Sequence, residues 1–117
     1  MSTEREPRLF LDDMIAAAHE LAAIAAEGEA AFKQTLRSRL AAERLIEILG
    51  EASSQLSDEV KLRFPDVPWR ALSATRNRVI HGYHSLDADR IWALTVTSTP
   101  ELLTQLRAVL RALDSES

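Results

Sequence analysis

The chain has 117 residues, of which 46% are hydrophobic, 27% charged and 5% aromatic, a composition typical of one globular domain. It contains no cysteine, which excludes disulfides, cysteine nucleophiles and thiolate metal sites and is compatible with a cytoplasmic location. The net charge of -4 argues against a protein that coats nucleic acid through bulk charge, and no run of roughly 20 apolar residues predicts a membrane span or a membrane partner.

Prolines and glycines divide the chain into segments of helical length, and no segment alternates polar and apolar residues as a strand would. Residues 1–7 lack an apolar run, so they are expected to form a flexible tail. From about Arg8 to Ala26, apolar residues recur at spacings of three and four, which predicts an amphipathic helix. Gly28 supplies the expected end of this helix.

A longer second helix is predicted from Glu29 to about Leu56. Phe32, Leu36 and Leu40 follow one apolar stripe, and further apolar residues continue it toward the end of the segment. A stripe of this kind normally faces the core of a helical protein.

The second half of the chain is also divided into helical segments. They are a short helix capped by Ser57 and ending at Phe64, a helix from Trp69 to about Ile80 that ends at His81-Gly82, a helix capped by Asp87, and, after a break before Glu101, a final amphipathic helix. Trp69 and Trp92 are expected to lie in the core. The pattern therefore predicts an all-α fold, with residues 1–117 forming a single domain built as an up-and-down bundle of four to six helices.

One part of the chain departs from the plain amphipathic pattern. Between Lys61 and Arg90 the chain carries a net charge of +3, whereas the rest carries -7. Within it, residues 76–84 contain two arginines, two histidines, an asparagine and the only tyrosine. A solvated face is the commoner explanation of clustered charge, but this segment is the first place to expect a phosphate partner.

The residue types of this segment suit phosphodiester cleavage without a metal. Imidazole can take the proton of a ribose 2'-hydroxyl, and guanidinium can hold phosphate oxygens while negative charge develops on them. Asn77 and Arg78 each lie about one helical turn before His81, whereas Arg76 is rotated from His81 by about 140° on a regular helix. A change of direction at Gly82, or a second subunit, must therefore bring these groups to one substrate.

Two other patterns have plainer explanations. Glu47 and Glu51 are four residues apart, where like charges repel, so a solvated face or a salt bridge is a better explanation than a paired acid and base. Glu51 can also orient an arginine of the segment 76–84. His81 and His84 stand beside arginines in a chain without cysteine, which makes a poor cation site, so neither a metal nor another cofactor is expected.

The motif resembles that of a known family. Arg76, four intervening residues, His81, Gly82 and Tyr83 match the R-x4-6-H-x-Y signature of HepT-like toxins in the HEPN superfamily. His84 stands where that family often has an aromatic residue, so the resemblance gives no support for a second catalytic histidine.

The resemblance extends beyond the motif, from about Arg39 to Leu113. Residues 46–52, IEILGEA, are similar to the family's I-x-I-I-G-E-A helix, and Pro68-Trp69 is similar to its P-x-x-P-W turn. After the motif, Asp87 and Trp92 stand where family members have an aspartate and a tryptophan.

The resemblance implies a HEPN domain that forms a homodimer, with the motifs of both subunits in one cleft. It implies that Arg76 and His81 cleave RNA without a metal, that Asn77 assists and that Arg78 supports the phosphate site. It also implies a toxin of a type VII-like HEPN/MNT toxin–antitoxin system. Its partner would be a minimal nucleotidyltransferase (MntA-like) antitoxin, which transfers AMP to Tyr83. A larger hetero-oligomer of the two proteins is compatible with the resemblance, which leaves the stoichiometry open.

Two alternatives stay open. The chain could be a HEPN domain that no longer cleaves RNA and serves as the binding partner and AMP acceptor of a nucleotidyltransferase. It could also be a helical adaptor unrelated to RNA. The first alternative predicts the same fold and partner as the toxin, and cleavage by a His81 variant separates the two.

Overall fold

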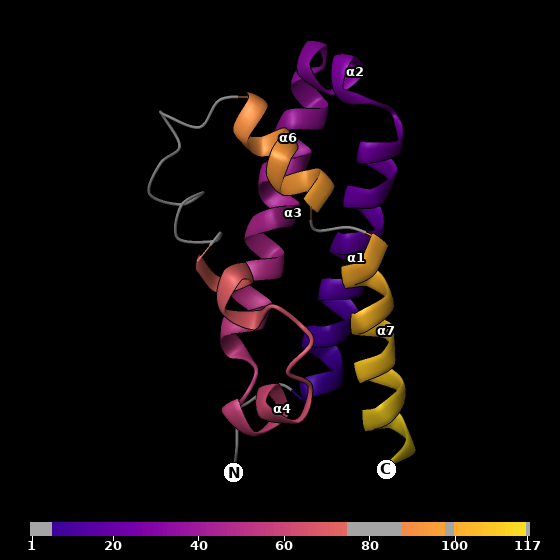
Figure 1. Ribbon diagram of the computed structural model, residues 1–117, viewed down its shortest axis with the longest axis vertical. Helices are drawn as coiled ribbons and strands as arrows, with labels where there is room; N and C mark the ends of the chain where they lie inside the picture. The colour runs from indigo at the N-terminus through magenta and orange to yellow at the C-terminus, as the bar shows by residue number, and fades with distance from the viewer. Residues whose placement is uncertain (1–5, 75–87, 98–99, 117) are drawn as a thin grey trace.

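A computed structural model describes residues 6–74, 88–97 and 100–116. Within these ranges the chain is helical and has no strand, which confirms the all-α prediction (Figure 1). The helices are α1 (Pro7–Ala26), α2 (Glu29–Gln34), α3 (Leu36–Gln55), α4 (Asp58–Arg63), α6 (Ala88–Thr97) and α7 (Pro100–Ser115), and residues 69–74 are also helical.

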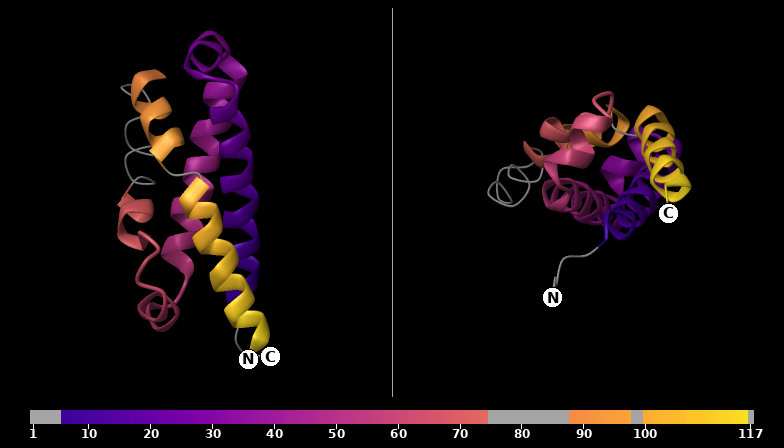
Figure 2. Two further views of the ribbon diagram at one scale, coloured as in Figure 1. Left: turned by 45° about the vertical axis from the view of Figure 1, so that its right-hand side comes forward. Right: turned by 90° about the horizontal axis from the view of Figure 1, so that it is seen from below.

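The helices form two layers. The long helices α1 and α3 lie side by side in the back layer of Figure 1, and α6, α7 and residues 69–74 lie in front of them. The view from below in Figure 2 shows both layers end-on. The molecule measures 45 × 27 × 22 Å, so the layers present a broad front face and a broad back face.

The core lies between the layers, where the predicted stripes of the first and last helices meet. Many of its buried side chains come from α1, α3 and α7: Leu11, Met14, Leu21, Ile46, Leu49, Leu102, Leu106 and Val109. The spacing of three and four residues in each helix therefore does place one face in the core, as the sequence predicts.

The predicted second helix is wrong in one respect. Thr35 has an extended backbone, with φ -113° and ψ 105°, and it separates α2 from α3. Threonine tolerates this conformation well because its branched side chain disfavours the helix interior. The break resets the helical phase, so that Phe32 is buried against Trp92 while Leu36 and Leu40 remain 59% and 54% exposed. The single buried stripe expected for Phe32, Leu36 and Leu40 is thus not formed.

Several predicted helix ends are confirmed. Ser57 caps α4, because its hydroxyl oxygen accepts a hydrogen bond of 3.3 Å from the backbone nitrogen of Val60. Gly28 follows α1 with a φ of +96°, a value that side chains rarely adopt. Pro100 is the first residue of α7, where its missing N–H is not needed.

Candidate active site

The residues predicted to carry the chemistry lie in the segment 75–87, outside the described residues. They are Arg76, Asn77, Arg78, His81 and Tyr83, together with His84 and the expected cap Asp87. The structure does describe residues 64–74, which lead into this segment, and α6, which follows it. These two elements determine where the segment begins and where it ends.

The turn over residues 64–69, here called the proline turn, is closed by Trp69. The indole nitrogen of Trp69 donates a hydrogen bond of 3.0 Å to the carbonyl of Phe64. The backbone nitrogen of Val67 donates to the same carbonyl at 3.3 Å, and that of Trp69 donates to the carbonyl of Val67 at 2.8 Å. Pro68 starts the next helical segment with the φ that its ring already fixes. The Pro-Trp pair therefore sets the direction in which the chain approaches the motif.

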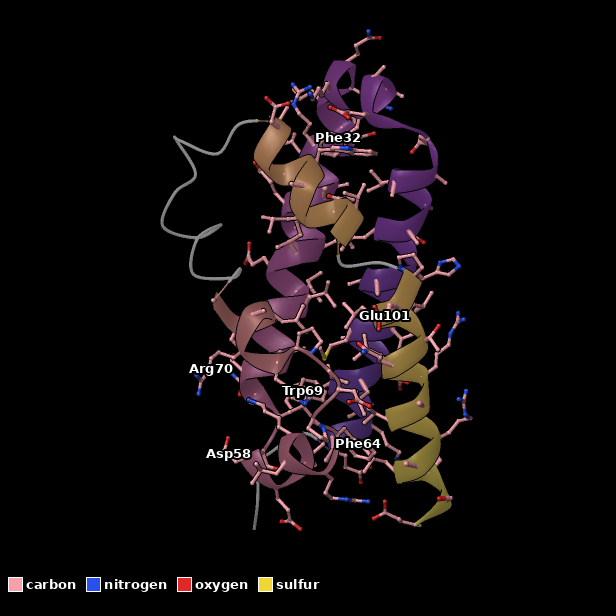
Figure 3. The ribbon with its side chains drawn as sticks, in the orientation of Figure 1. Phe32, Asp58, Phe64, Trp69, Arg70 and Glu101 are labelled. Carbon is pink, nitrogen blue, oxygen red and sulfur yellow. The ribbon has the colours of Figure 1, made fainter. Side chains whose placement is uncertain are left out.

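Two hydrogen bonds, one buried and one exposed, hold the proline turn against the long helices. From α3, the hydroxyl of Ser53 donates a hydrogen bond of 3.2 Å to the carbonyl of Trp69. From α7, the side-chain amide of Gln105 donates one of 2.9 Å to the carbonyl of Asp66. Leu72, one turn further on, is only 6% exposed. Trp69 is 8% exposed and belongs to the core, whereas Figure 3 shows Arg70 pointing outward.

The other end of the segment is held by α2. The ring of Phe32 lies against that of Trp92 on α6, with centroids 5.3 Å apart and planes tilted by 45°. Lys33 forms ion pairs with Asp89 on α6 and, at 2.7 Å, with Glu29. Hydrogen bonds to Asp89 and Glu29 raise the pKa of Lys33 above its ordinary value. The first turns of α6 are therefore fixed by a ring contact and by a charged contact.

The buried face of α6 adds a third contact. Ile91 and Thr95 are 2% and 0% exposed, and the Thr95 hydroxyl donates to the Ile91 carbonyl at 2.8 Å. This bond lies within α6 and satisfies the buried hydroxyl of Thr95. The segment 75–87 thus connects two elements that are each packed on the core.

Glu47 and Glu51 lie on the other side of α3. Glu47 pairs with Arg44 at 2.8 Å, which supports the salt-bridge interpretation of this residue. Glu51 lines a groove of about 780 Å³ between α1 and α3. Because Glu51 and Ser53 are two residues apart, they are rotated from each other by about 200° around the helix. The idea that Glu51 orients an arginine of the motif stays a prediction.

Within residues 6–74, 88–97 and 100–116, no three histidine, aspartate or glutamate side chains gather closely enough to hold a metal ion. Among the helices described, none is both long enough and apolar enough to cross a membrane.

Known proteins resemble this chain over most of its length. The sequence model of the ribonuclease HepT-like family matches residues 14–109. The chain belongs to the ribonuclease HepT-like family. The match covers the proline turn, the motif and α6, and it confirms the resemblance noted in the sequence. No solved structure matches this HepT-like chain.

Individual relatives support the same assignment. A protein named as a candidate RNase from Methanocaldococcus jannaschii is 27% identical over 108 residues, covering 92% of this chain and 99% of the relative. A candidate ribonuclease HepT from Thermococcus cleftensis is 32% identical over 56% of this chain and 60% of its own length. A candidate RNase from Caldanaerobacter subterraneus is 32% identical over 58% of this chain and 61% of the relative.

The sequence did not predict the residues that hold the proline turn of this HepT-like chain. Ser53 lies on the buried side of α3, and a serine at such a position predicts a hydrogen-bond partner without saying which one. No sequence pattern indicates the role of Gln105, because its side-chain amide bonds to the backbone of a residue 39 positions away.

Proposed function

We propose that the chain is the toxin of a toxin–antitoxin pair, an endoribonuclease that cleaves RNA without a metal. The observation that carries the proposal is the Arg76, His81, Gly82, Tyr83 motif in a chain that belongs to the ribonuclease HepT-like family. Relatives named as candidate RNases support it, as does the packing of both elements that flank the motif.

The proposed reaction is an intramolecular transesterification. His81 takes the proton of the ribose 2'-hydroxyl, the 2'-oxygen bonds to phosphorus, and the bond from phosphorus to the 5'-oxygen breaks. The leaving oxygen receives a proton, and the products end in a 2',3'-cyclic phosphate and a 5'-hydroxyl. Arg76 holds the phosphoryl oxygens as negative charge develops on them, with Asn77 and Arg78 in supporting positions. DNA lacks the attacking hydroxyl and is inert by this route.

The proposal includes a homodimer that works in the cytoplasm, where the RNA substrate is. On a regular helix Arg76 and His81 diverge by about 140°, so one motif alone does not direct both groups to one phosphate. A second subunit that places its own motif in the same cleft supplies the missing group. The acidic net charge of -4 supports a substrate surface confined to that cleft.

Cleavage of RNA by the purified chain in excess EDTA tests the nuclease. We expect His81→Ala to lower the cleavage rate by about 10²- to 10⁴-fold, the usual contribution of a general acid or base. His19→Ala is the matched control, because His19 is 61% exposed on α1 and distant in sequence from the motif. Equal cleavage by wild type and His81→Ala would contradict the proposal.

Regulation is the second part of the proposal. A minimal nucleotidyltransferase antitoxin directs the phenol oxygen of Tyr83 onto the α-phosphorus of ATP, and pyrophosphate leaves while the phenol proton passes to a base. The added AMP places bulk and negative charge beside Arg76 and His81, which blocks the phosphate site. The two proteins meet transiently or in a larger hetero-oligomer.

The modification is simple to test because Tyr83 is the only tyrosine of the chain. Incubation with such an antitoxin and ATP should add the mass of one AMP to the wild type and none to Tyr83→Phe. Modified wild type should lose cleavage, whereas Tyr83→Phe should keep it. If wild type gains AMP but never cleaves RNA, the chain is instead a binding partner and AMP acceptor.

A further inference from the structure

The helical stretch of residues 69–74 is the last described part of the chain before the motif, and it carries one charged side chain, that of Arg70. Arg70 is exposed, and so are Ala71 and Ala74, whose side chains are small. The stretch contains no acidic residue. It therefore presents a single cation on a surface that the backbone of another chain can approach closely.

The backbone that carries Arg70 is held on both sides. The carbonyl of Trp69 accepts a hydrogen bond of 3.2 Å from Ser53, and the backbone nitrogen of Leu72 donates one of 3.0 Å to the carbonyl of Pro68. Trp69 and Leu72 are 8% and 6% exposed. Arg70 is rotated from Leu72 by about 200° around the helix, which explains why it points outward in Figure 3. Binding through Arg70 thus costs the freedom of one side chain and requires no ordering of its backbone.

The charge of Arg70 is not used inside the protein. Arg8, Arg44 and Arg63 each form an ion pair with a carboxylate, including the pair of Arg63 with Glu116 on the neighbouring part of the chain. Within the described residues, Arg70 has neither an ion pair nor a hydrogen bond from its guanidinium. Other exposed arginines without an ion pair in this part of the structure lie on α3 and α7. Arg70 differs from them because it lies on the element that leads into the motif.

The chain between Arg70 and the motif is short. Arg70 and Arg76 are six residues apart, so their Cα atoms are at most about 22 Å from each other, whatever the conformation between them. An RNA strand carries one phosphate for every nucleotide, so a strand with one phosphate at the motif has others nearby. Arg70 is therefore close enough to meet a second phosphate of the same strand.

We propose that Arg70 binds a backbone phosphate of the RNA substrate, a few nucleotides from the phosphate that is cleaved. Its guanidinium can donate to two phosphoryl oxygens at once, and no internal ion pair has to break first. In the helix that the sequence predicts from Trp69 to about Ile80, Arg70 and His81 are rotated from each other by only about 20°, so both face the same strand. The contact adds affinity and fixes the position of the strand without selecting a base. This inference rests on the proposed function and adds a substrate-binding residue to it.

The length of the RNA tests the contact, because a dinucleotide contains only the phosphate that is cleaved. We expect Arg70→Gln to lower kcat/KM about five- to tenfold on an RNA of about 12 nucleotides, mainly by raising KM, because one phosphate contact is lost. On the dinucleotide, the loss should be less than about twofold. An equal loss on both RNAs, which a folding defect would cause, overturns the proposal, and so does the absence of a loss on the longer RNA.

Arg107→Gln is the matched control. Arg107 is also exposed and also without an ion pair among the described residues, but it lies on α7. Figure 1 shows α7 on the opposite side of the molecule from residues 69–74. The control removes the same charge from the chain, so it should cleave both RNAs like the wild type. A loss equal to that of Arg70→Gln would show an effect of net charge and would overturn the contact.

The salt dependence of binding measures the same contact without cleavage. The probe is a fluorescent RNA of about 12 nucleotides with 2'-O-methyl groups throughout, which cannot be cleaved through the 2'-oxygen. When the logarithm of the binding constant is plotted against that of the salt concentration, Arg70→Gln should have a slope shallower by about 0.7, the effect of one phosphate contact in a single strand. Arg70→Lys keeps the charge and should keep most of the slope. A wild-type slope in Arg70→Gln overturns the proposal, also where the dinucleotide is cleaved too slowly to measure.

The proposed contact and the proposed function fail in different ways. Wild-type protein that binds the probe but never cleaves RNA contradicts the proposed function, while the slope of Arg70→Gln still tests the contact. A nuclease whose Arg70→Gln variant matches the wild type on the longer RNA and in its slope contradicts the contact alone. Protein that neither binds nor cleaves RNA contradicts both.

Discussion

The hydroxyl of Ser53 donates a hydrogen bond of 3.2 Å to the carbonyl of Trp69, and the Ser53 side chain is completely buried. This single bond joins the last turn of α3, which packs along α1, to the first residue of the helical stretch that leads to the motif. Trp69 in turn closes the proline turn through its indole nitrogen. The approach to the candidate active site is therefore fixed to the core at the residue where it begins.

Ser53→Ala tests this bond, and Ser54→Ala is the control. We expect Ser53→Ala to lower the free energy of unfolding by about 1 kcal/mol, because it removes one buried hydrogen bond. The melting temperature should fall by about 4 °C in thermal unfolding. Ser54 is exposed and bonds only to the carbonyl of Glu51 in its own helix, so its removal should change stability little. Equal effects of the two substitutions would contradict the assigned role.

Phe32→Ala tests the contact that holds α6. Phe32 is 1% exposed and its ring lies against Trp92, so truncation leaves a cavity in the core. The free energy of unfolding, measured in urea, should fall by about 3 to 5 kcal/mol. The tryptophan fluorescence of the folded protein should also change, because Trp92 loses its ring contact. Leu62→Ala, at a leucine that is 80% exposed, should stay within about 0.5 kcal/mol of wild type. A comparable loss in both variants would show that Phe32 is not the support described.

Lys33→Met tests the charged contact at the start of α6 and has a defined pH dependence. The pKa of Lys33 is raised by hydrogen bonds to Asp89 and Glu29, so its stabilisation is fully present below its ordinary pKa of 10.5. It is lost only as the pH rises through the raised pKa. The melting temperature of Lys33→Met should thus lie slightly below that of wild type, by a constant amount from about pH 6 to about pH 9, where the carboxylates are ionised. A difference that disappears within this range would be inconsistent with the ion pairs.

Much of the fold is predictable from the sequence because helical periodicity is a local signal. The spacing of apolar residues located α1 and α7, and the hydroxyl of Ser57 located the start of α4. The break at Thr35 was not predicted, because the apolar residues on both sides happen to continue one pattern. The packing of Phe32 on α6 favours two helices over one, and such a contact is not encoded locally.

The candidate site, like the fold, is only partly predictable from the sequence. The chemistry of Arg76 and His81 can be inferred from residue types and from the family resemblance, since both are properties of a short segment. The contacts of Ser53 with Trp69 and of Gln105 with Asp66 could not be inferred, because they join residues 16 and 39 positions apart. The exposure of Leu36 and Leu40 follows from the unpredicted break at Thr35.

The central claim is that the chain cleaves RNA through the 2'-hydroxyl, with His81 as the proton acceptor. The most direct test incubates the purified protein, in excess EDTA, with an RNA and with the same RNA carrying one 2'-deoxy residue at the mapped cleavage position. The account predicts cleavage of the RNA to a 2',3'-cyclic phosphate end, no cleavage at the deoxy position, and cleavage by His81→Ala that is about 10²- to 10⁴-fold slower. Cleavage at the deoxy position, or products ending in a 5'-phosphate, would contradict it.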